Sequence, residues 1–179
     1  IVGRVAVNYY LLKELTLNDF KKKYFGSYLG IIWPFINPLV TILIFWFVFD
    51  IGFKATPVDN APFVLWLSAG IIPWFFFSET LVAGGNSLLE YSFLIKKVSV
   101  KLNFVPIIKV FSNFFIHLFL IFVLMFLSCY YGYYPSWYWL QIPYYMLCLL
   151  VLISALTIGF SALSLFIKDI SNFLSMMIQ

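Results

Sequence analysis

Two polar side chains inside long apolar stretches are the candidates for chemistry. His117, the only histidine, lies in residues 110–167, which contain no Asp, Glu, Lys or Arg before Lys168. Glu79 follows an aromatic run, residues 74–77, in a second apolar stretch. An ionisable residue within a membrane segment is a candidate functional residue, because its burial there is costly. Each has a structural alternative, since either could instead hydrogen-bond a neighbouring helix, and Glu79 could also face a wet cavity.

Other catalytic patterns are missing from the sequence. It contains no Walker A loop, no GxSxG nucleophile motif and no cysteine–histidine ligand cluster. The two cysteines, Cys129 and Cys148, lack metal-ligand spacing. A membrane-embedded acyltransferase that modifies glycans would need a cluster of histidines or carboxylates, for which only His117 and Glu79 are available. We therefore predict that the chain is not an enzyme and holds no cofactor or metal of its own.

The composition is that of a membrane protein. Of the 179 residues, 64% are hydrophobic and 10% are charged, whereas a soluble domain has about 25% charged residues. So few charges cannot cover a surface that faces water. The formal net charge of +4 does not predict a nucleic-acid partner, because the basic residues cluster beside apolar runs, where membrane topology accounts for them.

The apolar runs predict four membrane-spanning helices, each near the 20 residues that a helix needs to cross the hydrocarbon. We expect them at residues 31–53, 61–82, 102–130 and 140–166. Pro73 lies in the middle of the second span, and Gly84-Gly85-Asn86 is expected to end it. Residues 171–179 begin another apolar run. This pattern predicts a single transmembrane domain over residues 1–179, truncated in its fifth span.

The distribution of basic residues predicts the orientation. Lysine at the centre of a membrane helix costs about 2.5–3.5 kcal/mol, and Lys and Arg gather on the cytoplasmic side. In the predicted membrane topology, ten of the eleven basic residues fall on one side of the membrane and Lys54 falls on the other. The ten are Arg4, Lys13, Lys21, Lys22, Lys23, Lys96, Lys97, Lys101, Lys109 and Lys168. We therefore expect a cytoplasmic N-terminus, with the turns at residues 54–60 and 130–139 facing outward.

Three segments outside the spans have two interpretations each. Residues 9–24 alternate leucine with charge, which fits either an interfacial helix or a basic linker. The return segment, residues 86–106, is flanked by lysines and suits either docking of a soluble partner or a solvated linker. Residues 130–139 contain seven Tyr and Trp residues, which could form an aromatic belt at the headgroups or a stacking platform for a sugar chain.

Residues 11–38 resemble the opening of the permease subunits of ABC transporters that export polysaccharides, which include exporters of O-antigen, capsule and teichoic acid. In that family a charged interfacial helix precedes the motif Y-x-G-S-x-L-G-x-x-W-x-x-x-N-P. The matching residues are Tyr24, Gly26, Ser27, Leu29, Gly30, Trp33, Asn37 and Pro38. Phe25 stands where the family often has Arg.

Three further stretches resemble the same family in the same order. The second predicted span is similar to its G-x-x-P-W-x-F-F run, through Gly70, Pro73, Trp74, Phe76 and Phe77. LIKKV, residues 94–98, matches a family motif, but the following SVKLNFVP departs from the family's aromatic, Pro and Arg. FIKDI, residues 166–170, resembles F-x-R-D-I, with Lys168 in place of Arg.

The resemblance implies an all-α, polytopic bundle that forms a six-span permease and works as a homodimer in the bacterial plasma (inner) membrane. Two copies of a separate ATPase would dock from the cytoplasm and would bind ATP and Mg²⁺. The substrate would be a lipid-linked polysaccharide. A permease for drugs or lipids is the alternative, and it predicts growth defects unrelated to surface glycans.

The resemblance also implies roles for two segments. Residues 84–98 would be the coupling region, which touches the ATPase. Its predicted contacts are Asn86, Leu88, Leu89, Glu90, Leu94, Ile95, Lys96 and Lys97. Residues 1–30 would hold an interfacial gate helix. Its predicted residues are Leu12, Leu15, Phe20, Lys21, Lys22, Lys23 and Tyr24. We assign the translocation path to Trp33, Trp74, Phe76, Glu79, Tyr134 and Trp137.

Overall fold

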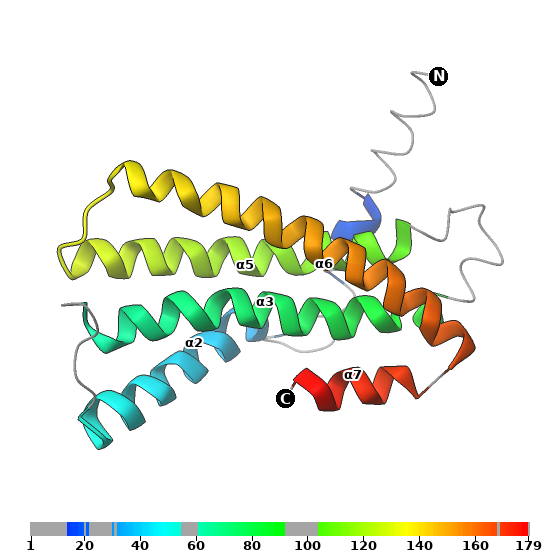
Figure 1. The fold of residues 1–179 in the computed structure, drawn as a ribbon, viewed down its shortest axis with the longest axis horizontal. Helices are drawn as coiled ribbons and strands as arrows, with labels where there is room; N and C mark the ends of the chain where they lie inside the picture. Colours follow the sequence, from blue (N-terminus) through cyan, green and yellow to red (C-terminus); the bar gives the residue numbers. More distant parts are fainter. Residues whose placement is uncertain are drawn as a thin grey trace.

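The chain folds into a bundle of long helices. The computed structural model describes residues 14–19, 21, 30, 32–54, 61–91, 104–167 and 169–178. In chain order its elements are α2 (Trp33–Trp46), the π-helix η1 (Phe47–Gly52), α3 (Phe63–Glu90), α5 (Phe104–Tyr130), the 3₁₀ helix η2 (Trp137–Leu140), α6 (Gln141–Phe166) and α7 (Ile170–Ile178) (Figure 1). Residues 14–19 are also helical. The predicted all-α class is confirmed.

Four helical stretches are long and apolar enough to cross a membrane, and each overlaps one of the four predicted spans. They are Trp33–Gly52, Phe63–Glu90, Phe104–Tyr130 and Trp137–Phe166. The polytopic architecture is therefore confirmed. The short helix α7 lies where the fifth span was expected to begin, and the six-span count remains a prediction.

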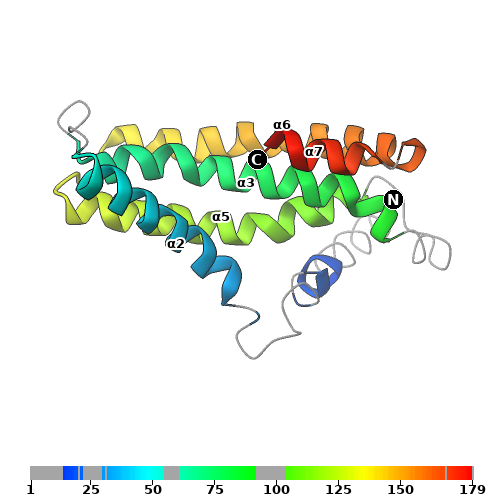
Figure 2. The ribbon, with the colours of Figure 1, turned by 90° about the horizontal axis from the view of Figure 1, so that it is seen from below.

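Helix α3 lies at the centre of the bundle. It contacts α2, α5, α6 and α7. Helices α3 and α6 run in the same direction and α5 runs opposite to them, while α2 crosses the bundle obliquely (Figures 1 and 2). One apolar cluster joins α2, α3 and α5 through Ile42, Ile72, Ile116 and Leu120. A second joins α3, α5 and α6 through Phe76, Val110 and Ile153.

The contact between α3 and α6 uses small residues. A Cβ atom at Gly84 would lie 2.5 Å from Cγ2 of Thr157, so only glycine fits there. The hydroxyl of Ser164 donates a hydrogen bond of 2.8 Å to the carbonyl oxygen of Gly85. Thr157, Ser161 and Ser164 are all buried. Helices in a membrane approach closely through small residues of this kind.

This contact corrects one expectation about the second span. The pair Gly84-Gly85, with Asn86, was expected to end the helix, but α3 continues to Glu90. Glycine weakens a helix by about 1 kcal/mol relative to alanine, which does not suffice to end one that is held by packing. The glycines serve the approach of α6 instead, and Gly85 lies under Leu174 of α7.

The end of the first span is wound as a π-helix. Within η1, Asp50 accepts a hydrogen bond of 2.8 Å from Nε1 of Trp46. An indole N–H is a suitable partner for a carboxylate near the end of an apolar helix. Lys54 follows with a positive φ of 50° and ends the described part of this segment.

Candidate functional site

Two features of the helix bundle are candidate sites. One is a cavity of about 490 Å³ among α3, α5, η2 and α6. The other is a group of charged residues where α3 ends and α5 begins. They lie toward opposite ends of α5, since the cavity extends to Leu124 and the charged group contains Lys109.

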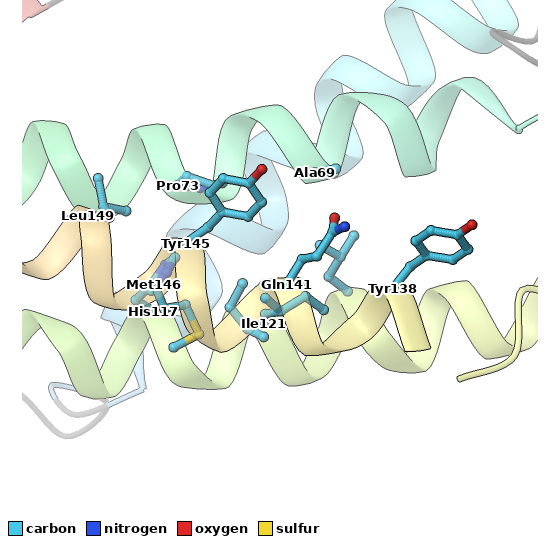
Figure 3. Close-up of a pocket in the computed structure, with 11 residues that line it drawn as sticks. Ala69, Pro73, His117, Ile121, Tyr138, Gln141, Tyr145, Met146 and Leu149 are labelled. Atoms are coloured by element: carbon cyan, nitrogen blue, oxygen red, sulfur yellow. The ribbon is translucent and has the colours of Figure 1, made fainter. Parts of the chain in front are cut away.

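The cavity has a mostly apolar wall with four polar side chains. These are His117 of α5, Tyr138 of η2, and Gln141 and Tyr145 of α6. His117 and Met146 lie toward one end of the cavity and Tyr138 lies at the other (Figure 3). Its volume is within the range of about 300–1,000 Å³ that is usual for small-molecule sites.

His117 is a buried member of the core that borders this cavity. It is 2% exposed, and its ring stacks on Phe76 at 4.7 Å between centroids. Its Nδ1 atom is buried and has no hydrogen-bond partner among the residues that the structure describes. The structural alternative for His117, a hydrogen bond to a neighbouring helix, is therefore not seen at Nδ1.

Replacing His117 with phenylalanine is expected to raise the melting temperature of the full-length protein. A buried polar atom without a partner costs about 1–3 kcal/mol, and phenylalanine removes it. The ring contact with Phe76 is kept, and the adjacent cavity leaves room for the larger ring. Thermal unfolding in detergent, followed by tryptophan fluorescence, measures the change. His117→Asn is the control, and it should lower the melting temperature because it loses the ring contact. A lower melting temperature for His117→Phe would contradict the prediction.

A polar cluster of four residues joins three segments of the chain. Nζ of Lys109, on α5, lies 2.9 Å from Oδ1 of Asp19 and 2.8 Å from Oε2 of Glu90, at the end of α3. The hydroxyl of Tyr91 donates a hydrogen bond to the same Oδ1 atom of Asp19. Nζ of Lys109 also lies 5.3 Å from the centre of the Tyr91 ring. We call Asp19, Glu90, Tyr91 and Lys109 the polar cluster.

The members of the polar cluster differ in burial. The side chain of Asp19 is 4% exposed and that of Lys109 is 11% exposed, whereas that of Glu90 is 51% exposed. Burial raises the pKa of the Tyr91 hydroxyl well above its ordinary value, and the hydrogen bond to Asp19 raises it further. Tyr91 therefore stays protonated and keeps donating to Asp19. The pair of Lys109 with Asp19 is the buried half of the cluster, and the pair with Glu90 is the half that faces solvent.

The predicted coupling contacts begin inside α3. Asn86, Leu88, Leu89 and Glu90 occupy its last two turns. Leu88 is buried and Glu90 is exposed. Residues 94–97, which supply the other four predicted contacts, lie outside the described part of the chain. Their role in coupling remains a prediction.

The predicted gate helix is described in part. Residues 14–19 are helical, with Leu15 half-buried and Lys21 exposed. Leu12, Phe20, Lys22, Lys23 and Tyr24 lie outside the described residues. The buried positions of the segment are Thr16 and Asp19, three residues apart on one helical face. The face toward the bundle is therefore polar, while Leu17 is exposed.

The structure does not gather the predicted path residues into one site. Phe76 is buried in the core, while Trp33, at the start of α2, is exposed. Trp74 is half-exposed and stacks on Phe77, at 5.8 Å between centroids. Glu79 is exposed on α3. Tyr134 and Trp137 are exposed in the turn between α5 and α6.

Asp19 and Tyr91 were not among the predicted site residues, and Lys109 was counted only for topology. One signal in the sequence could have found the cluster. Lys109 lies five residues into an apolar helix, where a charged side chain needs a partner. The sequence does not say which carboxylate supplies it, because Asp19 is 90 positions away.

Comparison with known proteins gives one family. The profile of the ABC-2 type transporter family matches residues 10–179. That range includes all the helices of the bundle and the polar cluster.

Three curated relatives are similar over most of this chain. An O-antigen export system permease protein RfbA from Myxococcus xanthus is 27% identical over 165 residues, which are 92% of this chain and 62% of that protein. Two proteins of the same name from Klebsiella pneumoniae are each 29% identical, over 93% of this chain and 63% of their own length. This chain therefore spans somewhat less than two thirds of these relatives.

Proposed function

The chain belongs to the ABC-2 type transporter family, and from this premise we propose that it is the membrane-spanning subunit of an ABC transporter that exports a lipid-linked polysaccharide. The observation that carries the proposal is the similarity, over more than nine tenths of the chain, to three O-antigen export permeases. Family membership and four apolar helices make it a multi-pass protein of the bacterial inner membrane.

The energy for export would come from a separate ATPase. The sequence of this chain has no Walker A loop, so ATP and Mg²⁺ would bind to the partner. Two ATPase copies would act on two copies of this chain, with the polysaccharide passing between the permeases. The distribution of basic residues supports a cytoplasmic N-terminus, which places the end of α3 and the start of α5 on the side of the ATPase.

The coupling region would receive the motion of the ATPase. Residues 94–97 follow the end of α3 by a few positions, so a push on them would reach the helix at the centre of the bundle. The exposed aromatic residues Tyr134 and Trp137, in the outward turn, would pack against sugars as the polymer leaves. Flat aromatic faces tolerate different sugars, which suits a polymer of variable composition.

Deleting the full-length gene in its host is expected to remove the surface polysaccharide and to leave lipid-linked polymer inside the cell. Staining of the polymer on intact cells and of the polymer extracted from lysed spheroplasts separates the surface pool from the internal pool. As the control, reintroducing the wild-type gene should restore the surface polysaccharide. A permease for drugs or lipids would leave the surface polysaccharide unchanged, and that result would refute the proposed substrate.

The double replacement Leu94→Asp/Ile95→Asp is expected to abolish this restoration while the purified complex still hydrolyses ATP. Two carboxylates would disrupt an apolar contact with the ATPase, since a buried charge without a partner is strongly unfavourable. Leu94→Met/Ile95→Val is the control and should restore export. Normal export by the aspartate variant would show that Leu94 and Ile95 do not contribute to coupling.

A further inference from the structure

The polar cluster is the place where the interfacial segment is attached to the bundle. Asp19 belongs to helical residues 14–19, whereas Glu90 and Tyr91 end α3 and Lys109 belongs to α5. Lys109 contacts all three partners, through two ion pairs and the ring of Tyr91. One lysine therefore connects three segments that are far apart in the sequence.

The attachment is specific because it is buried and charged. Asp19 and Lys109 are both almost fully buried, and a buried charge is tolerated only where a partner of opposite charge is held in good geometry. An apolar contact would let the segment slide over the bundle, but an ion pair with a hydrogen bond from Tyr91 fixes one register. The single cation faces two carboxylates, so Glu90 can leave for solvent without stripping Asp19 of its partner.

We propose that Asp19 and Lys109 are positioning residues of the transport cycle, which carry movement of the end of α3 to the interfacial helix. The proposal rests on the proposed function, because Asp19 and Lys109 can have this role only in a protein that undergoes a transport cycle. Residues 94–97, the predicted point of contact with the ATPase, begin three positions after Tyr91 in the sequence. Displacement of the α3 end therefore displaces Asp19 through the hydrogen bond from Tyr91, together with Lys109, which contacts the Tyr91 ring and pairs with Asp19. Glu90 is the part of the cluster that can exchange partners during this movement.

The test measures position and coupling separately, in the full-length protein assembled with its ATPase in lipid nanodiscs. Spin labels at Leu17→Cys and Phe111→Cys, both exposed positions, report the distance from residues 14–19 to α5 by pulsed electron resonance. Cys129 and Cys148 are first replaced by serine. The wild-type background should give one narrow distance distribution without nucleotide and a shifted one with trapped ATP.

Asp19→Asn is the decisive variant. We expect a broad distribution that ATP no longer shifts, ATP hydrolysis within about twofold of wild type, and surface polysaccharide reduced by about tenfold or more, which is a typical size for coupling between sites. Glu14→Gln, which removes an exposed charge from the same segment, should change none of these. Glu90→Gln should keep the narrow distribution, because it leaves the buried pair intact.

A charge-reversal variant distinguishes loss of the ion pair from misfolding of the protein. Asp19→Lys/Lys109→Asp keeps one cation and two carboxylates in the cluster, and it should narrow the distribution again and restore part of the export. A narrow, ATP-responsive distribution in Asp19→Asn, or a reversal that restores nothing, would overturn the proposal. The distance measurement needs no polysaccharide, so failure of the proposed substrate and failure of this linkage give different results.

Discussion

Gly84→Ala is expected to destabilise the full-length protein by about 3 kcal/mol or more, at the upper end of the cost of overpacking. The new Cβ would lie 2.5 Å from Cγ2 and 2.8 Å from Cβ of Thr157. Thr157 cannot turn away easily, because it is buried and its hydroxyl donates to the carbonyl oxygen of Ile153 at 2.8 Å. The helices α3 and α6 would have to separate along their contact.

Gly70→Ala is the matched control on the same helix. A Cβ at Gly70 would have nothing within 4 Å, so alanine should stabilise α3 by up to about 1 kcal/mol through helix propensity. The yield of monodisperse protein by fluorescence-detected gel filtration and the melting temperature measure both variants. Adding Thr157→Ser to Gly84→Ala removes the nearer atom and should recover part of the loss. Equal melting temperatures for Gly84→Ala and Gly70→Ala would show that the close contact is absent.

Lys109→Leu is expected to cost about 3–5 kcal/mol of stability, because it leaves Asp19 buried without a cation. Glu90 can turn to water, since its side chain is half-exposed, but Asp19 cannot. The hydrogen bond from Tyr91 compensates only in part. The stability change is measured as the shift in melting temperature of the full-length protein in detergent.

The double variant Asp19→Leu/Lys109→Leu is expected to recover most of this loss, since replacing both partners of a buried pair by apolar residues is often neutral. Lys21→Leu, at an exposed lysine two residues after Asp19, is the control and should change stability by less than about 0.5 kcal/mol. A double variant no more stable than Lys109→Leu would show that the cost does not come from the unpaired carboxylate.

The spans were predictable from the sequence because hydrocarbon excludes charge. The first was expected at residues 31–53 and is found at Trp33–Gly52, and the third was expected at 102–130 and is found at Phe104–Tyr130. Each helix contains a single charged residue near one end, Asp50 in the first and Lys109 in the third. The second span runs eight residues further than expected, because Gly84 and Gly85 serve packing and do not end the helix.

The candidate sites were less predictable because they depend on contacts between distant parts of the chain. Nothing near Asp19 in the sequence points to Lys109, and the pairing becomes visible only when helical residues 14–19 are placed against α5. Phe76 was assigned to the translocation path, and the structure places its ring against His117 in the core, so its part in the path remains a prediction. An aromatic pattern alone does not tell a lining residue from a core residue.

The small-residue contact between α3 and α6 limits how the molecule can move. Sliding α6 by one residue, about 1.5 Å along the axis, would move Thr157 away from the close contact that Gly84 allows. The hydrogen bond from Ser164 to the Gly85 carbonyl would break with it. The helices α3 and α6 therefore form one rigid unit. A conformational change during transport must therefore tilt α3 and α6 together or move the helices around them. It cannot slide α6 along α3.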